Sequence, residues 1–164
     1  MENIKKVLVA IAFSEYAQGT FNFAAQFAQC GGAELVVVSV INSRDVESVK
    51  TISAMGYDVD GSHYVQKIKD ERHRALDEII SAAGYPREKV RSIFLTGNPI
   101  DELLKQIMAE EADVIVMGPK GRTDLEHILV GSVAEKIFRR SPATIISYRG
   151  AKVAERLKKR IEHI

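Results

Sequence analysis

The chain has 164 residues, of which 46% are hydrophobic and 27% are charged, and its formal net charge is +1. These proportions are ordinary for a soluble globular protein, and the length suits one domain with a substantial core. A near-neutral charge gives no reason to expect nucleic acid as a partner, and a single cysteine, Cys30, excludes an internal disulfide framework.

Neither a signal peptide nor a membrane span is expected. A strand pattern begins almost at the first residue, and no apolar run approaches the ~20 residues that a bilayer span requires. We therefore expect a cytoplasmic protein. Cys30 ends an apolar helix pattern, so it is expected to be packed and chemically inert.

The first predicted elements are a buried strand at 7–12, VLVAIA, and a helix. Ser14 is the expected N-cap, and Gly31 with Gly32 ends the helix. Its expected buried row is Ala17, Phe21, Ala24 and Ala28.

A second buried strand, LVVVSVI, covers 35–41. Asn42 is expected to be a turn residue. Residues 42–60 show no sustained period, which predicts a long, lid-like connection. In that segment Met55 and Tyr57 are candidates either to cover a ligand or to pack on the adjacent helix.

An amphipathic pattern predicts a helix over 62–83, whose charged face at 67–74 is expected to be solvated. His63 and His73 are ten residues apart, which is not the spacing of a helical metal pair, so both are expected at the surface. A more alternating strand follows at 90–96, which indicates a sheet edge. Asn98 and Pro99 then start a helix with an expected buried stripe of Ile100, Leu103, Leu104, Ile107 and Met108.

The apolar run VIVM at 114–117 predicts a fourth buried strand, followed by a loop with glycines. A capping box of Ser132 and Glu135 is expected to open the next helix, with Ala134, Ile137 and Phe138 facing inward. A fifth strand follows at 143–148. The tail at 151–164 has a row of Val153, Leu157 and Ile161 among basic residues, which predicts an amphipathic helix.

This order predicts an α/β fold: a doubly wound five-stranded parallel sheet, order 3-2-1-4-5, with helices on both faces over residues 1–150. A ligand crevice is expected beyond the carboxyl ends of the first and fourth strands. The tail is expected to dock on its own domain or on a sister subunit, with a membrane surface or another partner as alternatives.

The spacing G-x-x-G-x(9)-G-S after the fourth strand, at Gly118, Gly121, Gly131 and Ser132, places free amides near a helix start. This arrangement favours an anion such as phosphate. The alternative is a plain surface loop that uses glycine for backbone freedom and serine as an ordinary cap.

The same spacing resembles the nucleotide loop of the universal stress protein family, and the resemblance covers about residues 4–149. It implies binding of ATP or a related adenine nucleotide, with or without Mg²⁺, and a homodimer formed through the last strand. Val40 is implied as a main-chain contact to adenine. The full set of implied binding residues is Val40, Met117, Gly118, Gly121, Arg122, Gly131, Ser132 and Val133.

One position departs from the family pattern. Members commonly have an aspartate, associated with holding adenosine, where this chain has Ala12. A methyl group accepts no hydrogen bond. The loss of a charged acceptor lowers the binding free energy by roughly 1.5–3 kcal/mol, which weakens binding without abolishing it.

Three functions are open. The first is a regulatory stress-response protein that binds ATP and hydrolyses it slowly at most, because no residue is identified that would activate water. The second is a nucleotide-free structural homodimer, for which Ala12 is the main argument. The third, an adenylating ligase, ranks last because the first strand lacks a serine-glycine-glycine loop. Lys120 and Arg122 are candidates to neutralise phosphates, and Asp124 or Glu126 to hold magnesium.

Overall fold

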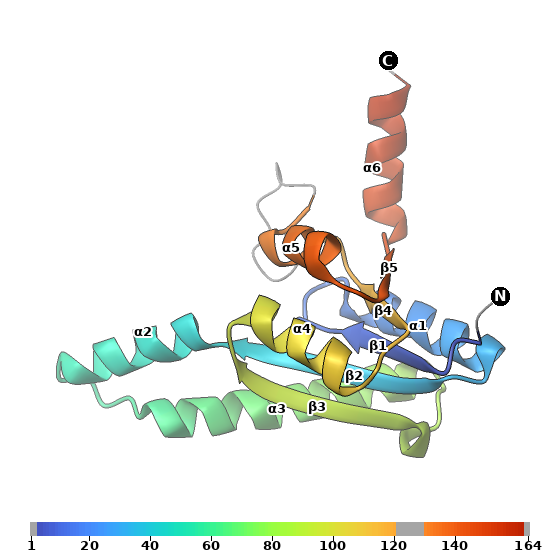
Figure 1. Ribbon diagram of the computed structural model, residues 1–164. Helices are drawn as coiled ribbons and strands as arrows, with labels where there is room; N and C mark the ends of the chain where they lie inside the picture. Colours follow the sequence, from blue (N-terminus) through green and yellow to red (C-terminus); the bar gives the residue numbers. More distant parts are fainter. Residues whose placement is uncertain (1–2, 121–129, 163–164) are drawn as a thin grey trace.

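Five parallel strands form one sheet in the order β3-β2-β1-β4-β5, as the sequence predicts (Figure 1). The computed structural model describes residues 3–120 and 130–162. The strands are β1 (Lys6–Ala10), β2 (Glu34–Asn42), β3 (Val90–Gly97), β4 (Val114–Met117) and β5 (Thr144–Ser147). The helices are α1 (Ala17–Gly31), α2 (Ser43–Ala54), α3 (Gly61–Ala82), the 3₁₀ turn η1 (Arg87–Lys89), α4 (Pro99–Ala109), α5 (Ser132–Arg140) and α6 (Ala151–Ile161).

The two faces of the central strands build two core layers. Val7 and Val9 of β1 pack toward α1 and α3, whereas Leu8 packs toward α4 and α5. All three side chains are fully buried, because helices cover both faces of a parallel sheet. Leu8 is in register with Val36 of β2 and Ile115 of β4, so one row of apolar side chains crosses the sheet.

The two outer strands behave as edges. In β3 every residue after Val90 is at least partly exposed, which confirms the prediction for this strand. In β5 only Ile145 and Ile146 are partly buried. Within residues 3–120 and 130–162, no strand pairs with the outer side of β5.

The prediction of a lid-like connection at 42–60 is wrong for most of its length, because residues 43–54 form helix α2. Asn42 is its N-cap rather than a plain turn residue: the side-chain Oδ1 accepts a hydrogen bond from the Arg44 N–H at 3.0 Å. Only Val46 of this helix is buried, which explains why the sequence shows no helical period. Met55 and Tyr57 are 71% and 66% exposed, so neither packs on the adjacent helix.

Two predicted helix starts are also wrong. Helix α1 begins at Ala17, and the Ser14 Oγ instead accepts a hydrogen bond from the Tyr16 N–H at 3.3 Å within a preceding turn. No capping box opens α5, because Gly131 is its N-cap and Ser132 is its exposed first residue. The Gly131 N–H donates to the Pro119 carbonyl at 2.8 Å, and this tie sets the start of the helix one residue early.

Three side chains expected inside are exposed. Phe138 of α5 and Met108 of α4 are 74% and 65% exposed, and the Cys30 thiol is also at the surface. Phe138 and Met108 lie on the outward side of their helices, where the preceding residues, Ile137 and Ile107, fill the core. Helix α4 otherwise starts as predicted, because Asn98 Oδ1 accepts from the Ile100 N–H at 3.0 Å and Pro99 occupies the first turn.

Helix α6 follows β5 and extends away from the sheet (Figure 1). Val153 in its first turn is buried, whereas Ile161 at its end is 66% exposed. Within the described residues, 3–120 and 130–162, no helix is both long and apolar enough to cross a membrane.

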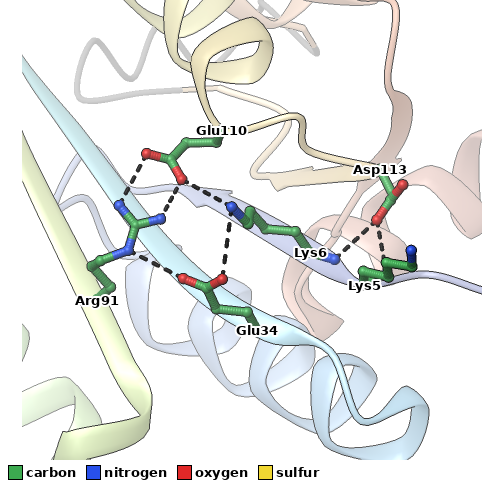
Figure 2. Close-up of polar contacts among 6 residues, drawn as sticks. All are labelled: Lys5, Lys6, Glu34, Arg91, Glu110 and Asp113. Atoms are coloured by element: carbon green, nitrogen blue, oxygen red, sulfur yellow. Dashed lines mark hydrogen bonds and ion pairs between the residues drawn. The ribbon is translucent and has the colours of Figure 1, made fainter.

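An ion-pair network joins the amino ends of three strands (Figure 2). Arg91 of β3 pairs with Glu34 of β2 at 3.1 Å and makes a two-pronged contact with Glu110 at the end of α4. The Lys6 ammonium of β1 lies 3.3 Å from the same Glu110. The hydrogen bond from Arg91 is the main reason that the pKa of Glu110 is lowered. This network lies at the opposite end of the sheet from the cavity described next.

Candidate functional site

A cavity of about 550 Å³ lies beyond the carboxyl ends of β1, β2 and β4. Its walls come from the end of β1 with the turn after it, from the end of β2, and from the segments before and after the residues 121–129. This is the edge at which doubly wound sheets bind ligands, where the chain crosses from β1 to the neighbours on either side.

One wall is the first turn of α5, which contributes Gly131, Ser132 and Val133. The N-cap of this helix is Gly131, which has no side chain to accept a hydrogen bond, and the amides of the first turn have no intrahelical acceptor. The tie from Gly131 to Pro119 holds these amides next to the end of β4. The arrangement favours a negatively charged group at this wall, because the amides and the helix dipole act together.

The glycines of this wall are not needed for unusual backbone angles. Gly131 has φ −71° and ψ 154°, which any residue adopts. At Gly118 an added Cβ would lie 3.5 Å from the Tyr16 Cβ, which is an ordinary van der Waals contact. The remaining reason for glycine here is space in the cavity that both residues line. Met117, just before Gly118, is buried and lines the same wall.

The opposite wall is formed by β2, which continues past the end of β1. The Ile11 N–H donates to the Val38 carbonyl at 3.0 Å, and β1 itself ends at Ala10. Successive residues of a parallel strand direct their main-chain groups to alternate neighbours, so the Val40 N–H and C=O face the side that β1 has vacated. Val40 and Ala12 both line the cavity. The turn after Ala12 places Phe13 at φ 52°.

Sequence reasoning missed Arg72, which was expected on the solvated face of its helix. Arg72 is only 7% exposed and lines the cavity. Its Nη1 donates to the Ser39 Oγ at 2.8 Å, and its guanidinium carbon lies 5.8 Å from the centre of the Phe13 ring. The signal was present, because Arg72 is four residues from both Ile68 and Leu76 and so falls on the apolar row. The helix itself, and both surface histidines, are as predicted.

Among the described residues that line the cavity, two buried side chains are positively charged. Lys120 is 5% exposed and lines the cavity together with Arg72. Among the described residues that line the cavity, Asp45 is the one acidic side chain, and it is exposed on α2. Two buried cations and a helix start favour an anionic ligand.

Several predicted residues lie outside the described part of the chain. Gly121, Arg122, Asp124 and Glu126 fall in the segment 121–129, so their positions are not described. Within residues 3–120 and 130–162, no three His, Cys, Asp or Glu side chains gather in a way that would hold a metal ion. The structure therefore brings together Val40, Met117, Gly118, Gly131, Ser132 and Val133.

Comparisons with known sequences and solved structures all point to one protein family. The model of the universal stress protein family matches residues 3–149. A putative universal stress protein of Staphylococcus saprophyticus is 30% identical over 156 residues, which cover 94% of this chain and 89% of that protein. The solved structure of protein MJ0577 of Methanocaldococcus jannaschii has a TM-score of 0.71 and 26% identity, covering 91% and 99% of the two chains. A solved universal stress protein in complex with cAMP has a TM-score of 0.61 and 20% identity, covering 90% and 98%.

Proposed function

This chain belongs to the universal stress protein family, and we propose that it is a regulatory protein that binds ATP or a related adenine nucleotide in the crevice. One observation supports this proposal above the others: the first turn of α5, whose N-cap is a glycine, lines a cavity that is also lined by the buried cations Lys120 and Arg72. A polyphosphate chain has the charge and the acceptors that such a wall favours.

In this proposal the phosphates lie against the β4 side of the crevice. Gly118, Ser132 and Val133 offer main-chain amides, and Gly131 keeps the approach open. Met117 forms the floor. Gly121 and Arg122, outside the described residues, are proposed to complete the phosphate site, and Mg²⁺ is an optional companion of the phosphates.

The base lies on the β2 side in this proposal. The Val40 N–H and C=O supply one donor and one acceptor to the edge of a purine, whatever the side chain at that position. A solved family member is in complex with cAMP, an adenine nucleotide, which supports the choice of ligand class. Slow hydrolysis is the most that is expected, because the described residues around the cavity include one acid, Asp45, and it is exposed.

The wider role proposed is cytoplasmic and in the stress response, with residues 1–150 as the nucleotide unit and 151–164 as an appended helix. A homodimer through the last strand is part of the same proposal, because β5 has an open edge. The second candidate function is a nucleotide-free homodimer of the same family, which the presence of Ala12 in the cavity wall favours.

Two measurements on the purified protein test nucleotide binding. The first is mass spectrometry of compounds released by heat, which should show an adenine nucleotide. The second is the free energy of unfolding with added MgATP, which should rise by about 2.7 kcal/mol at one hundred times the dissociation constant. If no nucleotide copurifies and millimolar ATP changes nothing, the nucleotide-free function is correct instead.

A substitution locates the site. Gly131→Val is compatible with the backbone angles at that position, but it puts a branched side chain into the cavity and should abolish the stabilisation by MgATP. Gly150→Val is the matched control: it is also an N-cap glycine, at φ −57° and ψ 160°, and has no atom within 4 Å of an added Cβ. The control should keep the full stabilisation. A Gly131→Val protein that keeps it as well would show that the nucleotide binds elsewhere.

A further inference from the structure

Helix α5 lies near the rim of one face of the sheet. It connects β4 to β5 in a parallel crossover, whereas its neighbour α4 packs on β2 and β3 (Figure 1). Helix α5 therefore lies between α4 and the outer edge of β5. One side of this helix faces the sheet, a second side faces α4, and a third side faces the space beyond β5.

Contacts of two residues on α5 identify these sides. Ile137 is fully buried in the core layer beneath the helix. Arg140 faces α4, because its Nη1 lies 3.8 Å from the Asp101 carboxylate of that helix. Successive residues of an α-helix are about 100° apart, so Phe138 lies about 200° from Arg140 and about 100° from Ile137. Phe138 is therefore on the side that faces away from α4, toward the outer edge of the sheet.

Phe138 has the most exposed large apolar side chain among the described residues, at 74%. The other exposed residues of α5 are polar or charged, namely Ser132, Glu135, Lys136, Arg139 and Arg140. One exposed ring is common on protein surfaces and needs no explanation by itself. This ring, however, lies beside the outer edge of β5, with which none of the described strands pairs.

The edge of β5 offers little apolar surface to a second copy. The strand has four residues, of which Thr144 and Ser147 are exposed and polar. Ile145 and Ile146 are already partly buried in their own subunit. A stable interface buries about 800 Å² on each partner and has an apolar, often aromatic centre. The proposed dimer therefore needs apolar surface from an element next to β5.

Two-fold symmetry makes α5 that element. When an edge strand pairs antiparallel with its own copy in a continuous sheet, the two-fold axis is perpendicular to the sheet. Helices next to the edge on the same face then lie side by side across the axis. Because paired strands are about 4.8 Å apart and packed helix axes are about 8–10 Å apart, α5 of one copy can contact α5 of the other.

We propose that Phe138 is the aromatic anchor of this dimer and that its ring packs against α5 of the partner subunit. This inference rests on the homodimer of the proposed function. It extends that proposal from the main chain of β5 to a side chain of α5, and it identifies a second copy of this chain as the molecule that covers the exposed ring.

Sedimentation equilibrium of the full chain measures the dissociation constant of the dimer. Phe138→Ser removes the ring and should raise this constant at least about thirtyfold, the scale of one interface hot spot. Because the ring is exposed in the subunit, the variant should keep its fold, which circular dichroism checks. Met108→Ser is the matched control. Met108 is 65% exposed on α4, which lies farther from β5, so its loss should change the constant by less than about threefold.

A tryptophan at the same position reports on the contact directly, because the chain has no tryptophan of its own. The emission of Phe138→Trp should shift to shorter wavelength as the protein concentration rises through the dissociation constant, since the partner then covers the indole ring. Met108→Trp should emit as a solvent-exposed tryptophan at every concentration. Should Phe138→Ser fail to fold, the emission of Phe138→Trp still decides the question.

The outcomes separate this inference from the proposed function. If the wild type is a monomer at every concentration, both the homodimer and this inference are wrong, whereas nucleotide binding is tested independently with MgATP. Suppose instead that the wild type is a dimer and that Thr144→Lys, which places a charge on the β5 edge, is a monomer. If Phe138→Ser then dimerises as tightly as the wild type and Phe138→Trp keeps the emission of an exposed ring, the dimer through β5 stands and the inference about Phe138 is wrong.

Discussion

Two arginines of this protein have different roles because their surroundings differ. Arg72 and Arg91 are both arginines, yet one is buried beside Ser39 in the cavity wall and the other is half-exposed in an ion-pair network. Arg72 adds a positive charge to the cavity wall. The second joins β3 to β2 and α4 at the amino end of the sheet (Figure 2).

Stability should fall in acid because of Glu110. Its pKa is lowered from the usual 4.5, first through the hydrogen bond from Arg91 and then through that from Lys6. A carboxylate with a lowered pKa contributes stability that is complete above pH 4.5 and is lost as the pH falls through the lowered pKa. Glu110→Gln should therefore lower the free energy of unfolding by about 1 kcal/mol at pH 7 and flatten its dependence on pH below 4.5.

Urea unfolding between pH 2.5 and pH 7 measures this effect. Glu155→Gln is the control, because Glu155 forms an exposed helical pair with Lys159 at 3.7 Å and should change the free energy of unfolding by less than about 0.5 kcal/mol. If the two substitutions change the free energy of unfolding equally, the ion-pair network at Glu110 contributes no more to stability than an exposed helical pair.

At the scale of helices and strands, Tyr148, which follows β5, packs against α1 through two contacts. Gly19 of α1 lies against Tyr148, whose ring also packs on Phe23 with centres 5.5 Å apart. The Tyr148 N–H in turn donates to the Met117 carbonyl at 2.9 Å, so this ring is tied to the end of β4 beside the cavity.

Gly19→Ala should destabilise the fold although alanine favours helices. The new Cβ would lie 2.7 Å from Cε1 of Tyr148, so the ring must move against its neighbours. We expect the free energy of unfolding to fall by about 1–2 kcal/mol. Gly31→Ala, in the same helix with no atom within 4 Å of an added Cβ, should be neutral or stabilising by up to about 1 kcal/mol. Thermal unfolding of both variants measures the difference, and the expectation is wrong if Gly19→Ala melts no lower than the wild type.

At the scale of the whole molecule, the proposed homodimer joins two copies of the chain through the open edge of β5. A dimer through this edge would leave the cavity, at the carboxyl ends of β1, β2 and β4, outside the contact between sheets. In this proposal strand pairing and nucleotide binding can therefore be disrupted separately. Thr144→Lys should disrupt only the pairing, and Gly131→Val should disrupt only nucleotide binding.

The dimer has a direct test. Thr144→Lys adds a charge at an exposed position of β5, and two copies would bring like charges together across a pairing edge. Light scattering should find a dimer for the wild type and a monomer for Thr144→Lys. The melting temperature of Thr144→Lys should be nearly the same as that of the wild type, because the substitution leaves the fold of each subunit intact. Thr51→Lys, on the exposed side of α2, should remain dimeric. A wild type that is monomeric at every concentration would exclude the proposed dimer.

The amino-acid sequence alone determined the sheet and the place of the wall at which we propose that phosphate binds. Continuous apolar runs such as VIVM at 114–117 are buried on both faces in a parallel sheet, and alternating strands and helices leave few topologies open. The glycine spacing at Gly118 and Gly131 is local, and both residues line the cavity as the loop pattern indicates.

Only the tertiary structure decided which polar residues are inside and where helices start. The charge of Arg72 favoured the surface although the residue falls on the apolar row of α3, and the structure encloses it beside Ser39 and Phe13. Helix α2 has a single buried residue, and Gly131, the N-cap of α5, is held by its hydrogen bond to Pro119. The contacts of Arg72 with Ser39 and Phe13, and of Gly131 with Pro119, join segments that are apart in the chain, so local period and capping pattern do not specify them.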